Sequence, residues 1–326
     1  MPAAGCLART GGGAVARSRR SVSVGLVLTA AAIWGSSFVA IKLGLDAAPP
    51  ATSAWLRFLV AGVVSTAGVA VLGRLRLPLL KEPIILAIAA VNAGGFLLQY
   101  IGLADTNSAV AALLANIGVV VVAILAVRWL GERMTAGLLA AVGLAFLGGT
   151  LLATRGDLAT LATPGFRGAL FVAAASFVWS LFVVLGKLAM ARGVATESEI
   201  SWAVLALSAV MLLPPAVAID GVPALASLPA EAWWAALYNG VLCSSVAYVI
   251  YMRGLRELSA TATAVLTVAE ILVAFALTAA VFGYVVAGME AVGAALVVAA
   301  ILIASLASPQ GEGAAPPVSG GEPEPP

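Results

Sequence analysis

The amino-acid sequence predicts an all-α integral membrane protein with ten transmembrane helices, arranged as two inverted five-helix repeats. Of its 326 residues, 62% are apolar and only 10% are charged, whereas an ordinary soluble domain carries about 25% charged residues. Long apolar stretches recur along the chain, and basic residues gather on alternate connections between them. So few charges cannot cover a water-facing surface, and a bilayer is therefore the expected environment.

The apolar stretches are each long enough to cross the hydrocarbon core, which takes about 20 residues in a helix. Helices are favoured over strands because the stretches are continuous and lipid offers no partners to unpaired backbone groups. The first stretch follows Arg17, Arg19 and Arg20 as in a signal peptide, but its apolar run of about 21 residues is too long for a cleavable one. The predicted spans are residues 23–43, 52–73, 83–103, 107–129, 135–154, 167–190, 199–220, 232–253, 260–283 and 286–307.

The basic residues predict the orientation of these spans. With the N-terminus inside, twelve Lys and Arg residues fall on inner segments and only Arg155 and Arg167 on outer ones. Cytoplasmic segments carry such an excess, so we expect a multi-pass plasma-membrane protein with both termini in the cytoplasm. Residues 1–21 form a basic tail, and residues 308–326, rich in Pro, Gly and Glu, are expected to form a disordered tail.

The segment between the tails repeats itself, once in residues 22–154 and once in residues 155–307. Five crossings per copy is an odd number, so the second copy enters the membrane from the opposite side. Inverted repeats are typical of secondary transporters, which bind substrate near the midplane and work by alternating access. The matched positions are Trp34 and Lys42 with Trp179 and Lys187, at an offset of 145, and Gly102, Leu103 and Gly131 with Gly254, Leu255 and Gly283, at an offset of 152.

Several of these motifs together resemble one family, the EamA-type branch of the drug/metabolite transporter superfamily, over residues 23–307. They are Trp34-Gly-Ser-Ser-Phe, Arg57 early in the second span, Gly102-Leu103, Gly131-Glu132-Arg133 and the ninth span with Glu270. The resemblance implies a ten-helix inverted-repeat exporter of amino acids, metabolites or drug-like amphiphiles that does not hydrolyse ATP. The chain departs from the family where Ile271 and Val119 replace a proline and Gly283-Tyr284 replaces Gly-Glu, which leaves open whether spans four and nine are kinked.

Glu270 is the strongest candidate for a functional residue, because it is the only carboxylate deep within any predicted span. A central charge costs about 2.5–3.5 kcal/mol on insertion scales, and ionisable residues inside membranes are usually functional. We expect a protonated resting state. One interpretation is a proton site or a partner for a substrate cation, and the other is a neutral acid hydrogen-bonded between helices.

The remaining candidates for the substrate or ion pathway are also weighed against structural roles. Lys42 and Lys187 lie near opposite membrane faces, where snorkelling to the headgroups is favoured over a role as paired gates. Trp34 and Trp179 lie near the midplane and either stack on a ligand or pack between helices. Arg57 is assigned to snorkelling or to a structural tie.

Polar residues within or beside the spans complete the set of candidates: Asn92, Gln99, Asn116, Asn239, Ser244 and Ser245. Interhelical hydrogen bonds usually explain such residues. Asn92 and Ser244 share the offset of 152 and near-midplane depth, which favours both as cavity lining. A ladder of small residues in the last span, Ala287, Ala291, Ala295 and Ala299, indicates helix packing or a homodimer face.

The sequence contains no pattern for catalysis, a cofactor or a metal. It has no His, and therefore no Ser/His/Asp triad, and its two Cys form no metal-binding pair. The expected partners are a small-molecule substrate, the lipid bilayer and, as candidate coupling ions, protons; the net charge of +2 predicts no nucleic-acid binding. The alternatives to an exporter are an importer or exchanger of a sugar or nucleotide-linked metabolite, a membrane-embedded enzyme, and a non-transporting scaffold.

Overall fold

A computed structural model describes residues 8–105, 108–154, 156–157, 159, 166–282 and 288–307, with side chains left out at 8–17, 38–39, 42–43, 108–116, 153, 166, 169, 225, 278–279 and 281–282. Within these ranges the fold is all-helical, as the composition predicts. The elements are α1 (Ala8–Ala47), α2 (Pro50–Val71), η1 (Leu77–Lys81), α3 (Pro83–Asp105), α4 (Ser108–Leu130), α5 (Ala136–Thr154), α6 (Phe166–Ala191), α7 (Glu197–Asp220), α8 (Val222–Ala226), α9 (Ala230–Leu237), η3 (Tyr238–Val246), α10 (Ala247–Glu257), α11 (Ala260–Thr267), α12 (Ala269–Phe282) and α13 (Met289–Ala307).

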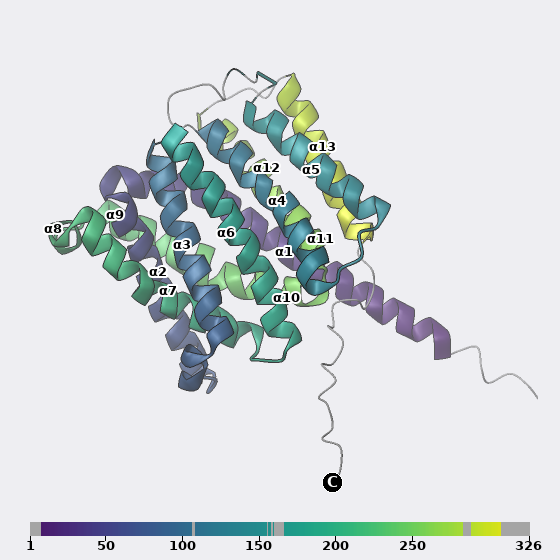
Figure 1. Cartoon of the computed structure of the whole chain (residues 1–326), viewed down its shortest axis with the longest axis horizontal. Helices are drawn as coiled ribbons and strands as arrows, with labels where there is room; N and C mark the ends of the chain where they lie inside the picture. Colours follow the sequence, from purple (N-terminus) through teal and green to yellow (C-terminus); the bar gives the residue numbers. More distant parts are fainter. Residues whose placement is uncertain are drawn as a thin grey trace, which may run out of the picture.

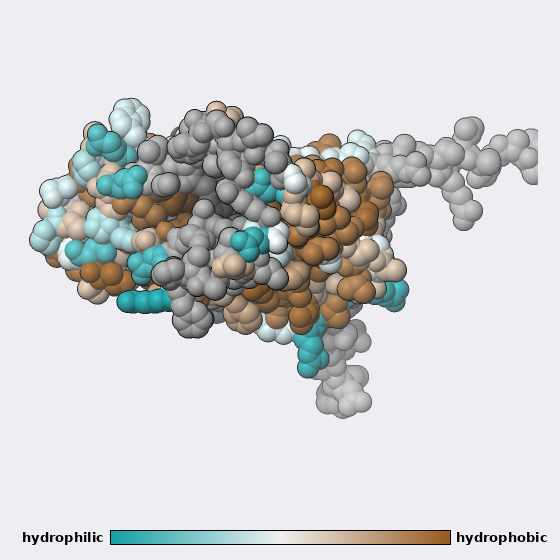
Figure 2. Space-filling model, turned by 90° about the horizontal axis from the view of Figure 1, so that it is seen from above, coloured by the Kyte–Doolittle hydropathy of each residue, from teal (hydrophilic) through white to brown (hydrophobic). Residues whose placement is uncertain are grey.

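Seven helical segments of the described chain are long and apolar enough to cross a membrane, and residues Ile117–Leu130 and Ala136–Leu152 form shorter apolar helices. Large apolar side chains on several helices point outward, including Leu139, Phe177, Val210 and Leu302. Figure 2 shows such side chains covering much of one end of the molecule. Outward apolar surface of this extent suits lipid contact, and the membrane class is confirmed.

Two of the predicted spans are not regular α-helices. Span 232–253 consists of α9, the π-helix η3 and α10, which follow one another without a gap. Span 260–283 is divided into α11 and α12 by a turn at Val268, whose N–H donates to the carbonyl of Val265 at 3.2 Å. This break occurs without the family's proline, which Ile271 replaces. Val119 lies within an uninterrupted α4.

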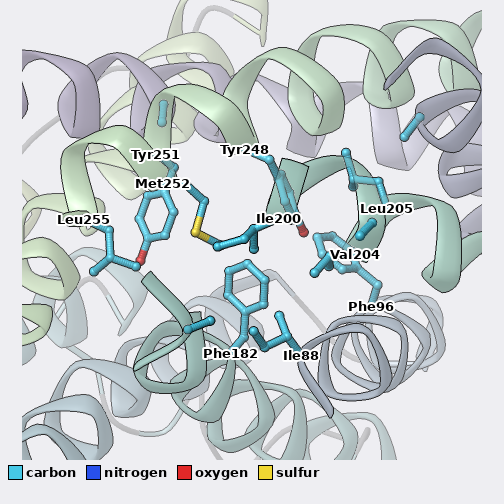
Figure 3. Packing of buried hydrophobic residues seen from close by; sticks show 14 of the residues in the cluster. Ile88, Phe96, Phe182, Ile200, Val204, Leu205, Tyr248, Tyr251, Met252 and Leu255 are labelled. Atoms are coloured by element: carbon cyan, nitrogen blue, oxygen red, sulfur yellow. The ribbon is translucent and has the colours of Figure 1, made fainter. Parts of the chain in front are cut away.

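Several extensive helix contacts come in pairs, one on each side of the sequence repeat. Figure 1 shows α3, α4 and α6 side by side. Helices α3 and α4 pack against α6, while α10 and α12 pack against α1. Two further extensive contacts, α2 with α7 and α5 with α13, join helices that correspond under the sequence repeat. An apolar cluster fills the centre, where Phe182, Tyr248 and Met252 meet (Figure 3).

Two close backbone contacts at glycines lie at positions that the sequence offsets of 145 and 152 relate to each other. A Cβ added at Gly102 would lie 2.9 Å from the carbonyl oxygen of Gly168, and one added at Gly254 would lie 2.9 Å from that of Ser23. Gly254 follows Gly102 by 152 residues, and Gly168 follows Ser23 by 145. Both pairs therefore bring two helix backbones together at equivalent places, where a side chain would not fit.

Helices α5 and α13 meet through Gly148 and Gly293, which also differ by 145. An added Cβ at either glycine would lie 2.7 Å from the carbonyl oxygen of the other. The face of α13 that packs here carries Gly293, Val297, Ala300 and Ala304. Ala291 and Ala295 of the predicted ladder are exposed instead, so the ladder is not the packing face, and the homodimer stays a prediction; Ala287 lies outside the described residues.

Candidate functional site

Polar side chains from two helices converge on η3. The π-helical turn changes the hydrogen-bonding pattern of the backbone, and such turns are frequent at functional sites. The carbonyl oxygen of Cys243 accepts hydrogen bonds from Trp34 Nε1 at 2.7 Å and from Arg57 Nη2 at 3.4 Å. Arg57 Nε also donates to Ser244 Oγ at 2.9 Å. We call Trp34, Arg57, Asn239, Cys243 and Ser244 the η3 cluster.

Arg57 does not snorkel, contrary to one of the two expectations, because its side chain turns inward and is only 1% exposed. Its guanidinium lies over the Phe96 ring, with Cζ 4.5 Å from the centroid, an arrangement in which the ring face attracts the cation. No Asp or Glu of the described chain forms an ion pair with it, and its Nη1 is buried without a hydrogen-bond partner. A lone arginine in an apolar span is the sequence signal that could have identified it.

Asn92 and Ser244, predicted to line a cavity, are both fully buried. Asn92 Nδ2 donates to Ser208 Oγ at 2.9 Å, and its Oδ1 accepts from the Tyr248 hydroxyl at 2.6 Å. These bonds connect α3 to α7 and α10, as interhelical hydrogen bonds in membranes do. In this conformation both residues therefore hold helices together.

Trp34 and Trp179 lie at positions related by the sequence repeat, and both are partly buried. The aromatic residues around them differ. The Trp34 ring packs against Tyr251 and Tyr248, with centroid distances of 5.0 and 5.9 Å. The Trp179 ring packs against Phe96 at 5.1 Å, and its Nε1 would lie 2.7 Å from a Cβ added at Gly95. Such edge and tilted pairs are favourable arrangements for aromatic rings. Both rings thus pack between helices and are only partly buried.

Glu270 lies in the first turn of α12, directly after the break at Val268, and its side chain is partly buried. Its carboxyl is close enough to the Tyr251 hydroxyl to interact with it electrostatically. No Lys or Arg forms an ion pair with Glu270 in the described part of the chain. Broken helices near the midplane commonly mark substrate and ion sites in transporters. The structure therefore places the predicted carboxylate at a second irregular backbone position.

Lys187 is buried, with 4% exposure, and the favoured snorkelling interpretation is wrong. Its Nζ donates to the carbonyl oxygens of Leu255, Arg256 and Leu258 at 2.7–2.9 Å. A cation at a helix C-terminus satisfies unpaired carbonyl groups and complements the helix dipole. Lys187 therefore caps α10; the side chain of Lys42 lies outside the described residues.

Glu132 of the Gly131-Glu132-Arg133 motif secures the other side of the same turn. Its carboxylate accepts from the backbone N–H of Ala260 at 2.5 Å and of Thr261 at 3.2 Å, at the start of α11. Anionic groups stabilise helix N-termini because the helix dipole is positive at that end, just as cations stabilise the negative C-terminal end. The motif is thus a structural clamp on the α10–α11 turn, and Tyr284 of the second copy lies outside the described residues.

A small cavity adjoins the η3 cluster between α1, α2, α3 and α9. It is lined by Ala40, Ile41, Gly44, Ser53, Arg57, Tyr100, Ala232, Ala235, Ala236 and Asn239, and has a volume of about 10 Å³, enough for about one water molecule. No group of three or more His, Cys, Asp or Glu that could bind a metal occurs in the described residues. Buried polar atoms beside broken helices in an all-helical membrane fold are typical of transporter sites.

Comparison with known proteins agrees with this class. The EamA-like transporter family model matches residues 22–154 and 166–306, and the chain belongs to this family. An uncharacterized transporter of Archaeoglobus fulgidus is 29% identical over 237 residues, covering 72% of this chain and 80% of that protein. A probable terminal-alkyne amino-acid exporter of Streptantibioticus cattleyicolor is 30% identical over 239 residues, covering 72% and 76%. A crystal structure with 19% identity superposes with a TM-score of 0.73 over 88% of this chain and 98% of that chain, which shows the fold alone.

Proposed function

We propose that this protein is a secondary transporter that exports small molecules by alternating access. It crosses the membrane ten times, as two inverted five-helix repeats in residues 22–154 and 155–307. The observation that carries the proposal is the pair of equivalent glycine contacts, Gly102 with Gly168 and Gly254 with Ser23. Two halves related in this way can exchange conformations, so that a central site opens first to one side and then to the other.

Amino acids are the preferred substrate class, with other small metabolites and amphiphiles as the wider range. The relative from Streptantibioticus cattleyicolor carries the name of an amino-acid exporter. The η3 cluster offers one buried cation, Arg57, and α12 offers one carboxyl, Glu270. A single charge of each sign suits a zwitterion better than a polyanion, which would need several basic groups.

The transport test uses inside-out membrane vesicles that contain the full-length protein. An imposed proton gradient should drive accumulation of members of a mixed pool of radiolabelled amino acids, above the level in vesicles without the protein. A neutral amphiphilic dye in the same vesicles tests the wider substrate range. Failure of every solute to accumulate or exchange, with the protein present and folded, would contradict the proposal.

The orientation, with both termini in the cytoplasm, is a separate expectation. Reporter fusions after Arg76, Arg133, Arg192 and Arg256 should report a cytoplasmic position, as should fusions at both ends, because these connections carry the basic residues. A fusion near Arg155 should report the outer side and serves as the matched control. An outer location for one end alone would contradict two odd-numbered halves, and an outer location for both ends would contradict the predicted orientation.

A further inference from the structure

We propose that Arg57 and Asn239 form a subsite for the carboxylate end of the substrate, which narrows the substrates to amino acids and closely similar carboxylates. The inference rests on the transport function proposed above and names the group that is recognised. Arg57 would bind the carboxylate, and Asn239 would accept a hydrogen bond from the neighbouring ammonium or hydroxyl. The two residues come from α2 and η3, so the subsite depends on the contact between these elements.

The first argument is the incomplete bonding of the two side chains. Arg57 Nη1 and Asn239 Oδ1 are both buried polar atoms without a hydrogen-bond partner, in residues only 1% and 2% exposed. Leaving such groups unpaired in the interior is unfavourable, and it is more unfavourable for a charged group. Both residues line the same cavity, so one bound molecule could satisfy the donor and the acceptor together.

The second argument is charge. The Arg57 guanidinium is held by neutral groups, namely Ser244 Oγ, the Cys243 carbonyl, the ring of Phe96 and the Tyr100 hydroxyl. In the described part of the chain no carboxylate balances it. A buried cation is strongly stabilised by an anion that brings two oxygens, and arginine binds carboxylates in a bidentate manner. A substrate carboxylate supplies that anion.

The third argument is that the remaining bonds orient the guanidinium. Nε is fixed by Ser244 and Nη2 by Cys243, so that Nη1 is the edge left for a ligand. Tyr100, which also lines the cavity, places its hydroxyl beside Arg57. The cavity in this conformation has room for about one water molecule, so the substrate would enter as the halves move apart.

The test compares acids with their carboxamides, which keep the ammonium but lose the negative charge. Purified full-length protein in detergent is titrated with L-leucine, L-phenylalanine and their carboxamides, with melting temperature and calorimetric Kd as readouts. The acids should bind about tenfold or more tightly than the carboxamides, as expected for a charge-assisted pair. Arg57→Gln should abolish the difference, and Arg57→Lys should restore part of it. Arg76→Gln removes an exposed arginine on the loop before α3 and should preserve the difference.

Equal responses of the wild-type protein to acid and carboxamide, including no response to either, would overturn the subsite. So would an unchanged preference in a folded Arg57→Gln variant. If that variant does not fold, a cysteine at Ala40, which lines the cavity, is introduced into a Cys6→Ala, Cys243→Ala background. L-leucine, but not its carboxamide, should then slow labelling by a charged thiol reagent, and equal rates would overturn the proposal.

The vesicle assay separates this inference from the proposed function. Transport of a neutral amphiphile, with no preference for acids in binding, would remove the subsite and leave the transporter standing. Preferential binding of acids that depends on Arg57, with no transport of any solute, would keep the subsite and contradict the transport function.

Discussion

Replacement of Gly148 by Ala should lower both the melting temperature and the yield of the protein well below those of the wild type. The new Cβ would lie 2.7 Å from the Gly293 carbonyl oxygen and 2.9 Å from Leu296 Cβ. The first of these atoms is backbone, so α5 and α13 must separate, and overpacking of this kind costs about 1–3 kcal/mol. Gly293→Ala should have a similar effect, since its Cβ would meet the Gly148 carbonyl at 2.7 Å.

Gly143 on the same helix provides the matched control, because a Cβ at this position meets nothing within 4 Å. Gly143→Ala should be neutral or stabilising by up to about 1 kcal/mol, since Ala is the better helix former. Melting in detergent, followed by fluorescence-detected size exclusion, measures all three variants. A Gly148→Ala protein as stable as Gly143→Ala would mean that α5 and α13 do not pack as described.

Replacement of Glu270 by Gln should reduce proton-driven accumulation to the level of vesicles without the protein, while counterflow exchange of the same substrate continues. Gln resembles the neutral acid in size and hydrogen bonding but carries no exchangeable acidic proton. The carboxyl stands in the first turn of α12 beside Tyr251, without a basic partner among the described residues. Intramembrane carboxyls in such places commonly carry protons in pumps and transporters.

Other outcomes would assign Glu270 a different role. Weaker transport of cationic substrates only, with neutral ones unaffected, would identify it as a partner for a substrate cation. Unchanged transport in a folded Gln variant would remove it from the mechanism. Glu132→Gln is a useful comparison, because this carboxylate caps α11 at the α10–α11 turn; it should reduce stability while leaving proton coupling intact.

The membrane class and the all-helical fold of this protein could be predicted from the amino-acid sequence alone. Apolar stretches of membrane length, almost without charge, leave no other environment, and backbone hydrogen bonding in lipid requires helices. The motifs at Trp34, Gly102 and Gly131 led to the EamA family, which the family match confirms. These conclusions were accessible because they depend on composition and on spacing along the chain, which are local properties.

The roles of the individual polar side chains became clear only from their contacts in the folded protein. Lys187 and Arg57 were both compatible with snorkelling, because a long basic side chain near a helix end can reach the headgroups or turn inward. The structure turns both inward, since the carbonyl oxygens at the end of α10 lie against Lys187 and the irregular backbone of η3 presents Cys243 to Arg57. The hydrogen-bond partners of these two side chains lie 68 and 186 residues away along the chain, so no local sequence pattern indicates them. The π-helix and the helix break without a proline are likewise produced by contacts between helices, and they too leave no local pattern.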